Sequence, residues 1–310
     1  MDEAYAVVEV MSDGEGNWND FLFLDANPAF MRHTTMPYPV GLTATQLLGT
    51  PNPNWAELYG HAVETGEAIR VEEGELTLGR VFDLNIFRLG GEGSRRVAVL
   101  FTDITERKRA EEALRASEER QAFLLKLSDA VRALDSAEEI QSVTNRLLGT
   151  HLGVDRVMFA EVGGEPGAET GFIRTQYIRQ ADAGRASLSS FPKHFDYRSF
   201  GEHAMAIRYR GDLLVVADID AGPDLMASER AAWAEARVKA AIVVPLARSG
   251  RLLAEFGVQS ATPRVWTEAE VSLVRDVGER TLAAVERAFT AEALQESEAR
   301  FRALAEASRR

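Results

Sequence analysis

The sequence lacks cysteine among its 310 residues. This absence excludes disulfides, thiolate metal sites, a cysteine nucleophile and a thioether-attached chromophore. Long apolar runs are also missing, because stretches such as Ala240–Leu246 fall far short of the ~20 residues that cross a bilayer. The start, Met1-Asp2-Glu3, has no basic region before an apolar stretch, so no secretory signal is visible. These absences predict a cytoplasmic protein with no membrane span in this chain.

Basic residues are outnumbered by acidic ones, with 35 Lys and Arg against 48 Asp and Glu. The formal net charge of −13 argues against nucleic-acid binding, which requires a basic face. Scattered histidines and the lack of a phosphate-binding loop leave no metal cluster, nucleotide cradle or activated nucleophile to nominate. What is present is a globular composition, with 45% hydrophobic and 27% charged residues over a length that suggests two domains.

An internal repeat organises the chain. Glu112–Arg120 reads EALRASEER and Glu292–Arg300 reads EALQESEAR. Both copies favour helix and contain neither glycine nor proline. Oppositely charged residues stand four apart at Glu111 with Arg115 and at Glu296 with Arg300. Two interpretations stand: a solvated surface helix, or a helical connector that pairs with a second copy of itself.

The first third of the sequence predicts a small antiparallel sheet with helices on one face. The expected strands are Ala4–Met11, Phe21–Asp25, Ala68–Leu76, Arg80–Leu89 and Arg96–Ile104, and the main helix is Asn54–Thr65, closed by Gly66. Strands first, then helices, then strands again indicate an α+β architecture.

Two motifs in this region carry a resemblance. Asp25–Phe30 reads DANPAF, and Asp103–Lys108 reads DITERK at the end of the last expected strand. Together they resemble a PAS domain, a sensory and dimerising module of which some members hold haem, flavin or small acids. Thr105 is expected to cap the helix that leaves the domain. His33 is the nearest candidate for a haem ligand, the alternative being a turn histidine, and no ligand is assigned.

The middle of the chain predicts a second α+β module. Ser136 with Glu139 forms a capping box, and Thr267 with Glu270 forms another before a long helix. Ser199 with Glu202 is expected to cap a third helix. The expected strands are Val154–Val162, Thr170–Gln180, Leu213–Ile219, Ala240–Leu246 and Arg251–Ser260.

The segments VVADI (Val215–Ile219), AIVVPL (Ala241–Leu246), FGVQ (Phe256–Gln259) and PRVWTEAE (Pro263–Glu270) resemble a GAF domain. The resemblance implies a pocket beside the sheet that binds cyclic nucleotides, linear tetrapyrroles, haem or small metabolites. A covalent bilin is excluded because there is no cysteine, and the residue set of cyclic-nucleotide-binding members has no counterpart. The cofactor is therefore unknown.

The pocket-side segment implied by this resemblance is Phe191–Arg210. It mixes aromatic with polar side chains, which is typical of a ligand wall. The candidate ligand-binding residues are His194, Tyr197, Arg198 and His203. A histidine beside an arginine could bind an anion or a non-covalent haem. The alternative is a set of polar surface residues.

The predicted domains are a PAS domain (1–105), a helical linker (106–122), a GAF domain (123–290) and a helical linker that begins a further PAS domain (291–310). A homodimer is expected through the helices. Its relay residues are predicted to be Leu114, Leu124, Val274, Leu282, Val285 and Phe289.

This arrangement is similar to the sensory region of bacterial histidine kinases. It implies a non-catalytic input region that detects a small ligand or partner and acts on a kinase or other output domain elsewhere in the parent protein. Two alternatives stay open: a ligand-free dimerisation scaffold, and a non-covalent haem, bilin or flavin photoreceptor or gas sensor.

Overall fold

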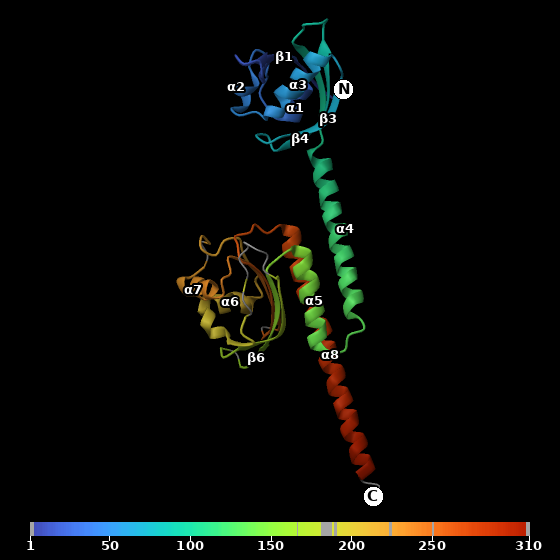
Figure 1. The fold of residues 1–310 in the computed structure, drawn as a ribbon, viewed down its shortest axis with the longest axis vertical. Coiled ribbons are helices and arrows are strands. Elements are labelled where there is room, and N and C mark those ends of the chain that lie inside the picture. Colours follow the sequence, from blue (N-terminus) through green and yellow to red (C-terminus); the bar gives the residue numbers. More distant parts are fainter. Residues whose placement is uncertain are drawn as a thin grey trace. The chain divides into compact units, whose positions relative to one another are not determined.

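The chain folds as two compact units, residues 1–115 and 116–310 (Figure 1). The computed structural model describes residues 3–165, 167–180, 188, 191–222, 225–249 and 251–307. Each unit contains one antiparallel sheet, of five and six strands, with helices packed on it. The predicted α+β class is confirmed. Among the described residues, no helix has the length and apolar character needed to cross a membrane.

The first unit is built on a five-stranded sheet in the order β2-β1-β5-β4-β3. Its strands are β1 (Ala4–Ser12), β2 (Trp18–Ala26), β3 (Ile69–Glu75), β4 (Arg80–Leu89) and β5 (Arg96–Asp103). Its helices are α1 (Pro28–Thr34), α2 (Ala44–Leu48) and α3 (Pro53–Thr65). The core forms because alternate strand residues, such as Phe82, Leu84 and Ile86, face the helices and are fully buried.

The junction between β5 and α4 (Thr105–Val131) corrects the predicted cap. Thr105 lies inside the first turn, and its backbone N–H donates to the Asp103 carboxylate at 2.9 Å. The Thr105 hydroxyl instead accepts the N–H of Val81 on β4. Asp103 also pairs with Arg80, and its own N–H donates to Nδ1 of His33 at 3.0 Å. The side chain of Thr105 thus links the start of α4 to β4. The Asp103 carboxylate accepts the hydrogen bond of a backbone N–H in the first turn of α4.

The second unit is built on a six-stranded sheet in the order β8-β7-β6-β11-β10-β9. Its strands are β6 (Arg156–Gly163), β7 (Thr170–Ile178), β8 (His194–Asp196), β9 (Leu214–Val216), β10 (Ala240–Arg248) and β11 (Arg251–Ser260). Its helices are α5 (Ala137–Leu152), α6 (Glu202–Arg210), α7 (Ala227–Glu235) and α8 (Glu268–Ala307), with a 3₁₀ turn at Tyr197–Phe200.

Different helices pack on the two faces of this sheet. On one face, Phe159 and Phe256 pack with Val274 and Val277 of α8 and with Leu127 of α4. On the other face lie α6 and α7, visible on the side of the sheet opposite α5 in Figure 1. Because successive strand residues point to opposite faces, each strand contributes to both layers.

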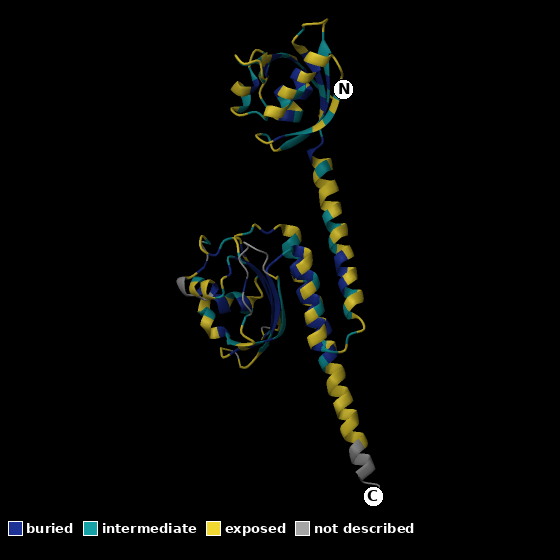
Figure 2. Ribbon diagram, viewed as in Figure 1, coloured by how far each residue is buried: buried dark blue, intermediate teal, exposed yellow. Residues whose placement is uncertain are grey.

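Helix α8 extends beyond the domain core. It begins with the predicted capping box, in which Thr267 and Glu270 exchange hydrogen bonds between side chain and backbone N–H. Residues 290–302 are all exposed (Figure 2). The predicted Glu296–Arg300 pair forms, whereas Glu111 pairs with Arg107 rather than with Arg115.

Two local predictions in the second unit need correction, and one strand was missed. Ser199 caps no helix, because its hydroxyl donates to the carbonyl of Asp196 within the 3₁₀ turn, and α6 begins after Gly201 without a side-chain cap. The expected strand Leu213–Ile219 is reduced to the three residues of β9. Strand β8, which pairs with β7 at the sheet edge, was not predicted.

Candidate functional site

A buried charged cluster lies on the α6–α7 face of the second sheet. We name this cluster of side chains the chamber; the name refers to the buried side chains and not to a measured cavity. Arg208 of α6 and Glu255 of β11 are 2% and 4% exposed, and the arginine Nε donates to Oε2 of the glutamate at 2.5 Å. The guanidinium lies over the rings of Tyr197 and Phe200, 5.6 and 5.0 Å from their centroids. Burial opposes the charge on Arg208, yet the Glu255 carboxylate keeps the pKa of Arg208 above its ordinary value.

Tyr197 is the part of the chamber that lacks a partner. Its side chain is fully buried, and its hydroxyl has no hydrogen bond to any residue that the structure describes. Burial, reinforced by the nearby Glu255 carboxylate, raises the pKa of Tyr197 well above the usual value, so the hydroxyl stays protonated and can donate. An unpaired buried donor is costly, so this hydroxyl is an exception to the general pairing of buried polar groups.

A second polar group occupies the same face of the sheet at the start of β6. Arg156 is 1% exposed; its Nε donates to Oε1 of Gln259 at 2.6 Å, and its guanidinium lies 5.3 Å from the ring centroid of Phe191. Burial lowers the pKa of Arg156 to about 10, so it stays charged at neutral pH. Nε2 of Gln259 is buried without a partner among the described residues. Gln176 fastens the backbone of Phe191 to β7 through two hydrogen bonds.

Of the four predicted ligand residues, the structure places only Tyr197 inside the chamber. His194 is exposed on β8 and stacks on Phe172, and exposed Arg198 pairs with Asp196. His203 is 42% exposed at its side chain, with Nδ1 3.2 Å from Oε1 of buried Glu229.

Four polar residues of this face were not predicted from the sequence: Arg156, Arg208, Glu255 and Gln259. The signal for three of them is alternation, since each occupies the chamber-facing phase of a strand that is otherwise apolar.

The predicted relay residues lie mostly inside the second unit. Leu124, Val274 and Val285 are buried in the chain's own core, while Leu282 and Phe289 are half-buried. Leu114, 61% exposed, is the member of this set that faces solvent. A second copy of the chain therefore has little access to most of these side chains, and their role in a dimer stays a prediction.

The interior of the first unit is filled by aromatic side chains. Phe30, Phe82 and Phe101 pack edge to face, and Tyr59 and Glu75 line the same space. The cavity among them is about 30 Å³, room for about one water and far below the several hundred Å³ of small-molecule sites. His33, half-buried at the edge of this core, is tied to Asp103 as described above.

The comparisons with known proteins bear on both units. Residues 136–285 match the GAF domain family model. Residues 136–285 are a GAF domain. The chamber lies on the sheet of this GAF domain, between β6, β11 and α6. The comparison with curated protein sequences found no match.

Solved structures resemble the chain at low identity. A bacteriophytochrome, RpBphP3 from the photosynthetic bacterium R. palustris, is 15% identical over 98% of this chain and 61% of its own, with a TM-score of 0.50. The phycoerythrobilin-bound GAF domain of a cyanobacterial phytochrome is 15% identical over 56% of this chain and 97% of its own, with a TM-score of 0.47.

Free methionine-R-sulfoxide reductase from Neisseria meningitidis, solved with its substrate, is 16% identical over 56% of this chain and 91% of its own, with a TM-score of 0.42.

The bacteriophytochrome alignment covers both units. It shows that the first unit has a PAS-like fold and that the order of folds is that of phytochromes, PAS then GAF. At these identities the likeness shows the fold.

The chamber does not fit a bilin held by a thioether bond, because the chain has no cysteine. The guanidinium of Arg208, which could pair with a ligand carboxylate, is already neutralised by Glu255. The Tyr197 hydroxyl and the Gln259 amide, both hydrogen-bond donors, are buried without a partner among the described residues.

Proposed function

We propose that this chain is the sensory and relay input region of a cytoplasmic bacterial signalling protein, with a sensor histidine kinase as the parent. In this proposal the GAF chamber binds a small polar ligand, and helix α8 passes the change onward in a homodimer. The chain itself catalyses nothing, and any kinase activity belongs to another part of the parent protein. The order of folds, PAS-like then GAF, supports a sensory role by analogy.

The single observation that carries the ligand is the Tyr197 hydroxyl. Natural proteins pair nearly all buried polar atoms, so a fully buried hydroxyl with no described partner points to a missing acceptor. The neighbouring Arg208–Glu255 pair is internally neutral, so the chamber favours a ligand with an uncharged or weakly charged acceptor, such as a carbonyl or hydroxyl group.

A short structural path joins the chamber to α8. Glu255 faces the chamber, and its neighbour Phe256 faces the helices. A Cβ added at Gly278 of α8 would lie 3.2 Å from Cβ of Phe256, so the helix backbone approaches β11 closely at this point. A ligand that shifts β11 through Glu255 would therefore shift the packing of α8 through Phe256.

The exposed end of α8 supports the dimer. Leu294 and Phe301 are seven residues apart, 60% and 71% exposed, and so lie on one stripe of the helix. A helical segment without tertiary contacts is marginal in water, so a partner helix would stabilise it. Pairing two copies along this stripe would place a second α8 helix beside the first.

The test is a thermal-shift screen of the purified chain against small polar metabolites, with the wild type and Tyr197→Phe side by side. A compound that stabilises the wild type and loses most of its effect on the variant supports ligand sensing.

The competing function is a ligand-free dimerisation and spacing scaffold. The filled interior of the first unit favours that role for the PAS-like unit. If no compound in the screen shifts the melting temperature, the scaffold role would apply to the whole chain.

A further inference from the structure

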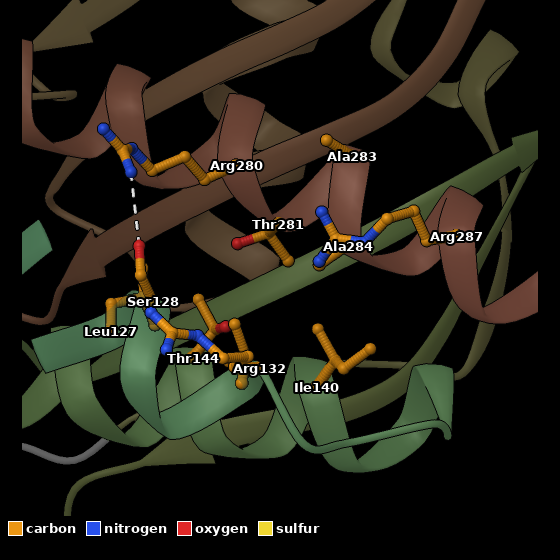
Figure 3. A pocket seen from close by; sticks show the side chains of 11 residues that line it. Leu127, Ser128, Arg132, Ile140, Thr144, Arg280, Thr281, Ala283, Ala284 and Arg287 are labelled. Carbon is orange, nitrogen blue, oxygen red and sulfur yellow. Dashed lines mark hydrogen bonds between the residues drawn. The ribbon is translucent and has the colours of Figure 1, made fainter. Parts of the chain in front are cut away.

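A groove lies on the helical face of the second unit, between the end of α4, the start of α5 and the middle of α8 (Figure 3). One wall is formed by α8 and the other by α4 and α5, as the labelled side chains in Figure 3 show. Its volume is about 430 Å³, within the range of about 300–1,000 Å³ that small-molecule sites occupy. Buried Leu127, Ile140 and Ala284 give it an apolar floor.

The charge of the groove is opposite to that of the chain. Arg132, Arg280 and Arg287 line it, and no described lining residue is acidic, although the whole chain carries a net charge of −13. These arginines make few hydrogen bonds or ion pairs with other described residues. Arg132 pairs with Asp129 three residues away, with both side chains more than 70% exposed, and Arg280 donates to Oγ of Ser128 at 3.2 Å. Arg287 makes no hydrogen bond or ion pair with any residue that the structure describes.

A buried hydroxyl gives the groove a second polar feature. Thr144 of α5 lines the groove and is 1% exposed, and its Oγ1 has no hydrogen-bond partner within the described parts of the chain. Thr281, on the facing wall, donates instead to the carbonyl of Val277 at 2.6 Å. Leaving Oγ1 of Thr144 unpaired is costly, and a ligand oxygen in the groove would accept its hydrogen bond.

We propose that this groove binds a small organic anion, a molecule with one carboxylate or phosphate group on a short apolar body. The arginines recognise the charged group, Thr144 donates to one of its oxygens, and the floor takes the apolar body. The site lies on the opposite face of the sheet from the chamber, and it does not depend on the proposed chamber ligand. Its occupant would contact α4 and α8 together, where Arg280 of α8 already meets Ser128 of α4.

A helix from a second copy is the rival occupant, and the charges disfavour it. In a parallel pair along α8, like positions meet, so Arg280 and Arg287 would face the same residues of the other copy. Repulsion between like charges opposes that pairing. The exposed apolar positions Leu294 and Phe301 lie further along α8, outside the groove.

The experiment is isothermal titration of the purified 310-residue chain with octyl phosphate and octanoate, each below its micelle concentration. Octyltrimethylammonium supplies the same body with opposite charge, and inorganic phosphate supplies the charged group alone. The variants are R280Q/R287Q and Thr144→Val. The matched control is R275Q/R302Q, which removes two exposed arginines of the same helix outside the groove.

The expected result is that at least one anion binds and the cation does not. R280Q/R287Q weakens binding by about tenfold or more, and Thr144→Val weakens it by about two- to tenfold. R275Q/R302Q binds as the wild type does. The tighter of the two anions identifies the charged group as phosphate or carboxylate, and either result supports the proposal. Thr144→Val also raises the melting temperature of the ligand-free chain, because it removes an unpaired buried hydroxyl, so its loss of binding cannot come from misfolding.

Three results would overturn the proposal: no binding of either anion at millimolar concentration, equal binding of the octyl cation, or wild-type affinity in R280Q/R287Q. Sedimentation separates the rival occupant. If R280Q/R287Q changes the oligomeric state and leaves anion affinity unchanged, the groove belongs to a second copy of the chain.

Discussion

Replacing Arg208 by Met tests the buried pair on which the chamber is built. The side chains of Arg208 and Glu255 are 3% and 5% exposed, so the variant leaves the glutamate charge buried without its partner. Removing one member of a buried pair costs about 3–5 kcal/mol, a large share of the about 5–15 kcal/mol that stabilises a typical domain. The variant also loses the hydrogen bond to the carbonyl of Ala204.

For a unit of this size, each kcal/mol moves the melting temperature by about 2–4 °C, so R208M should melt about 6–20 °C below the wild type in calorimetry. The double variant R208M/E255M removes both charges and should recover most of the loss. R210M, which breaks the exposed pair with Asp212, is the control and should change little. If R208M melts within 2 °C or so of the wild type, the buried-pair argument is refuted.

Three further predictions concern the helices, the PAS-like unit and catalysis. L294E/F301E should convert a sedimenting dimer into a monomer, because charges replace the exposed apolar stripe of α8; a monomeric wild type at high micromolar concentration would contradict the dimer. Thr105 and Arg80 hold the pKa of Asp103 below its ordinary 3.8 against the opposing effect of burial, so its carboxylate stabilises the fold above that pH and this stability is lost as the pH falls through the lowered pKa. In urea titrations the advantage of wild type over Asp103→Asn should therefore shrink below about pH 4, and an advantage that grows there would refute this assignment. Incubation with labelled ATP should leave the chain unlabelled, and stoichiometric labelling of any histidine would show that the chain itself carries catalysis.

Regular alternation made much of the fold predictable. Strands β4 and β11 match the predicted Arg80–Leu89 and Arg251–Ser260 residue for residue, because their alternating apolar residues mark one or both buried faces. Side-chain caps were equally readable at Ser136 and Thr267, where a short polar residue precedes a glutamate by three. Strand β8 was not predicted, and β9 was predicted too long, as Leu213–Ile219, because three-residue edge strands carry too little periodicity to fix their bounds.

The site was harder to predict because its members meet across long stretches of chain. Arg208 and Glu255 are 47 residues apart in the sequence, and no local pattern around either residue indicates that the two form a pair. Apolar helical stripes have the same ambiguity. Val274 and Val285, whose spacing suggested a dimer seam, are buried against the chain's own sheet and α5. Periodicity alone cannot distinguish packing inside the chain from packing against a second copy.

Ligand sensing in the chamber can be tested by the melting temperatures of wild type and Tyr197→Phe across one panel of small polar metabolites. At a concentration of about 100 times Kd, a ligand adds about 2.7 kcal/mol, which raises the melting temperature by about 5–10 °C. We expect such a shift in the wild type for at least one compound. We expect a clearly smaller shift in Tyr197→Phe, which keeps the ring and loses only the buried hydroxyl. Equal shifts in both proteins, or none in either, would contradict ligand sensing in the chamber.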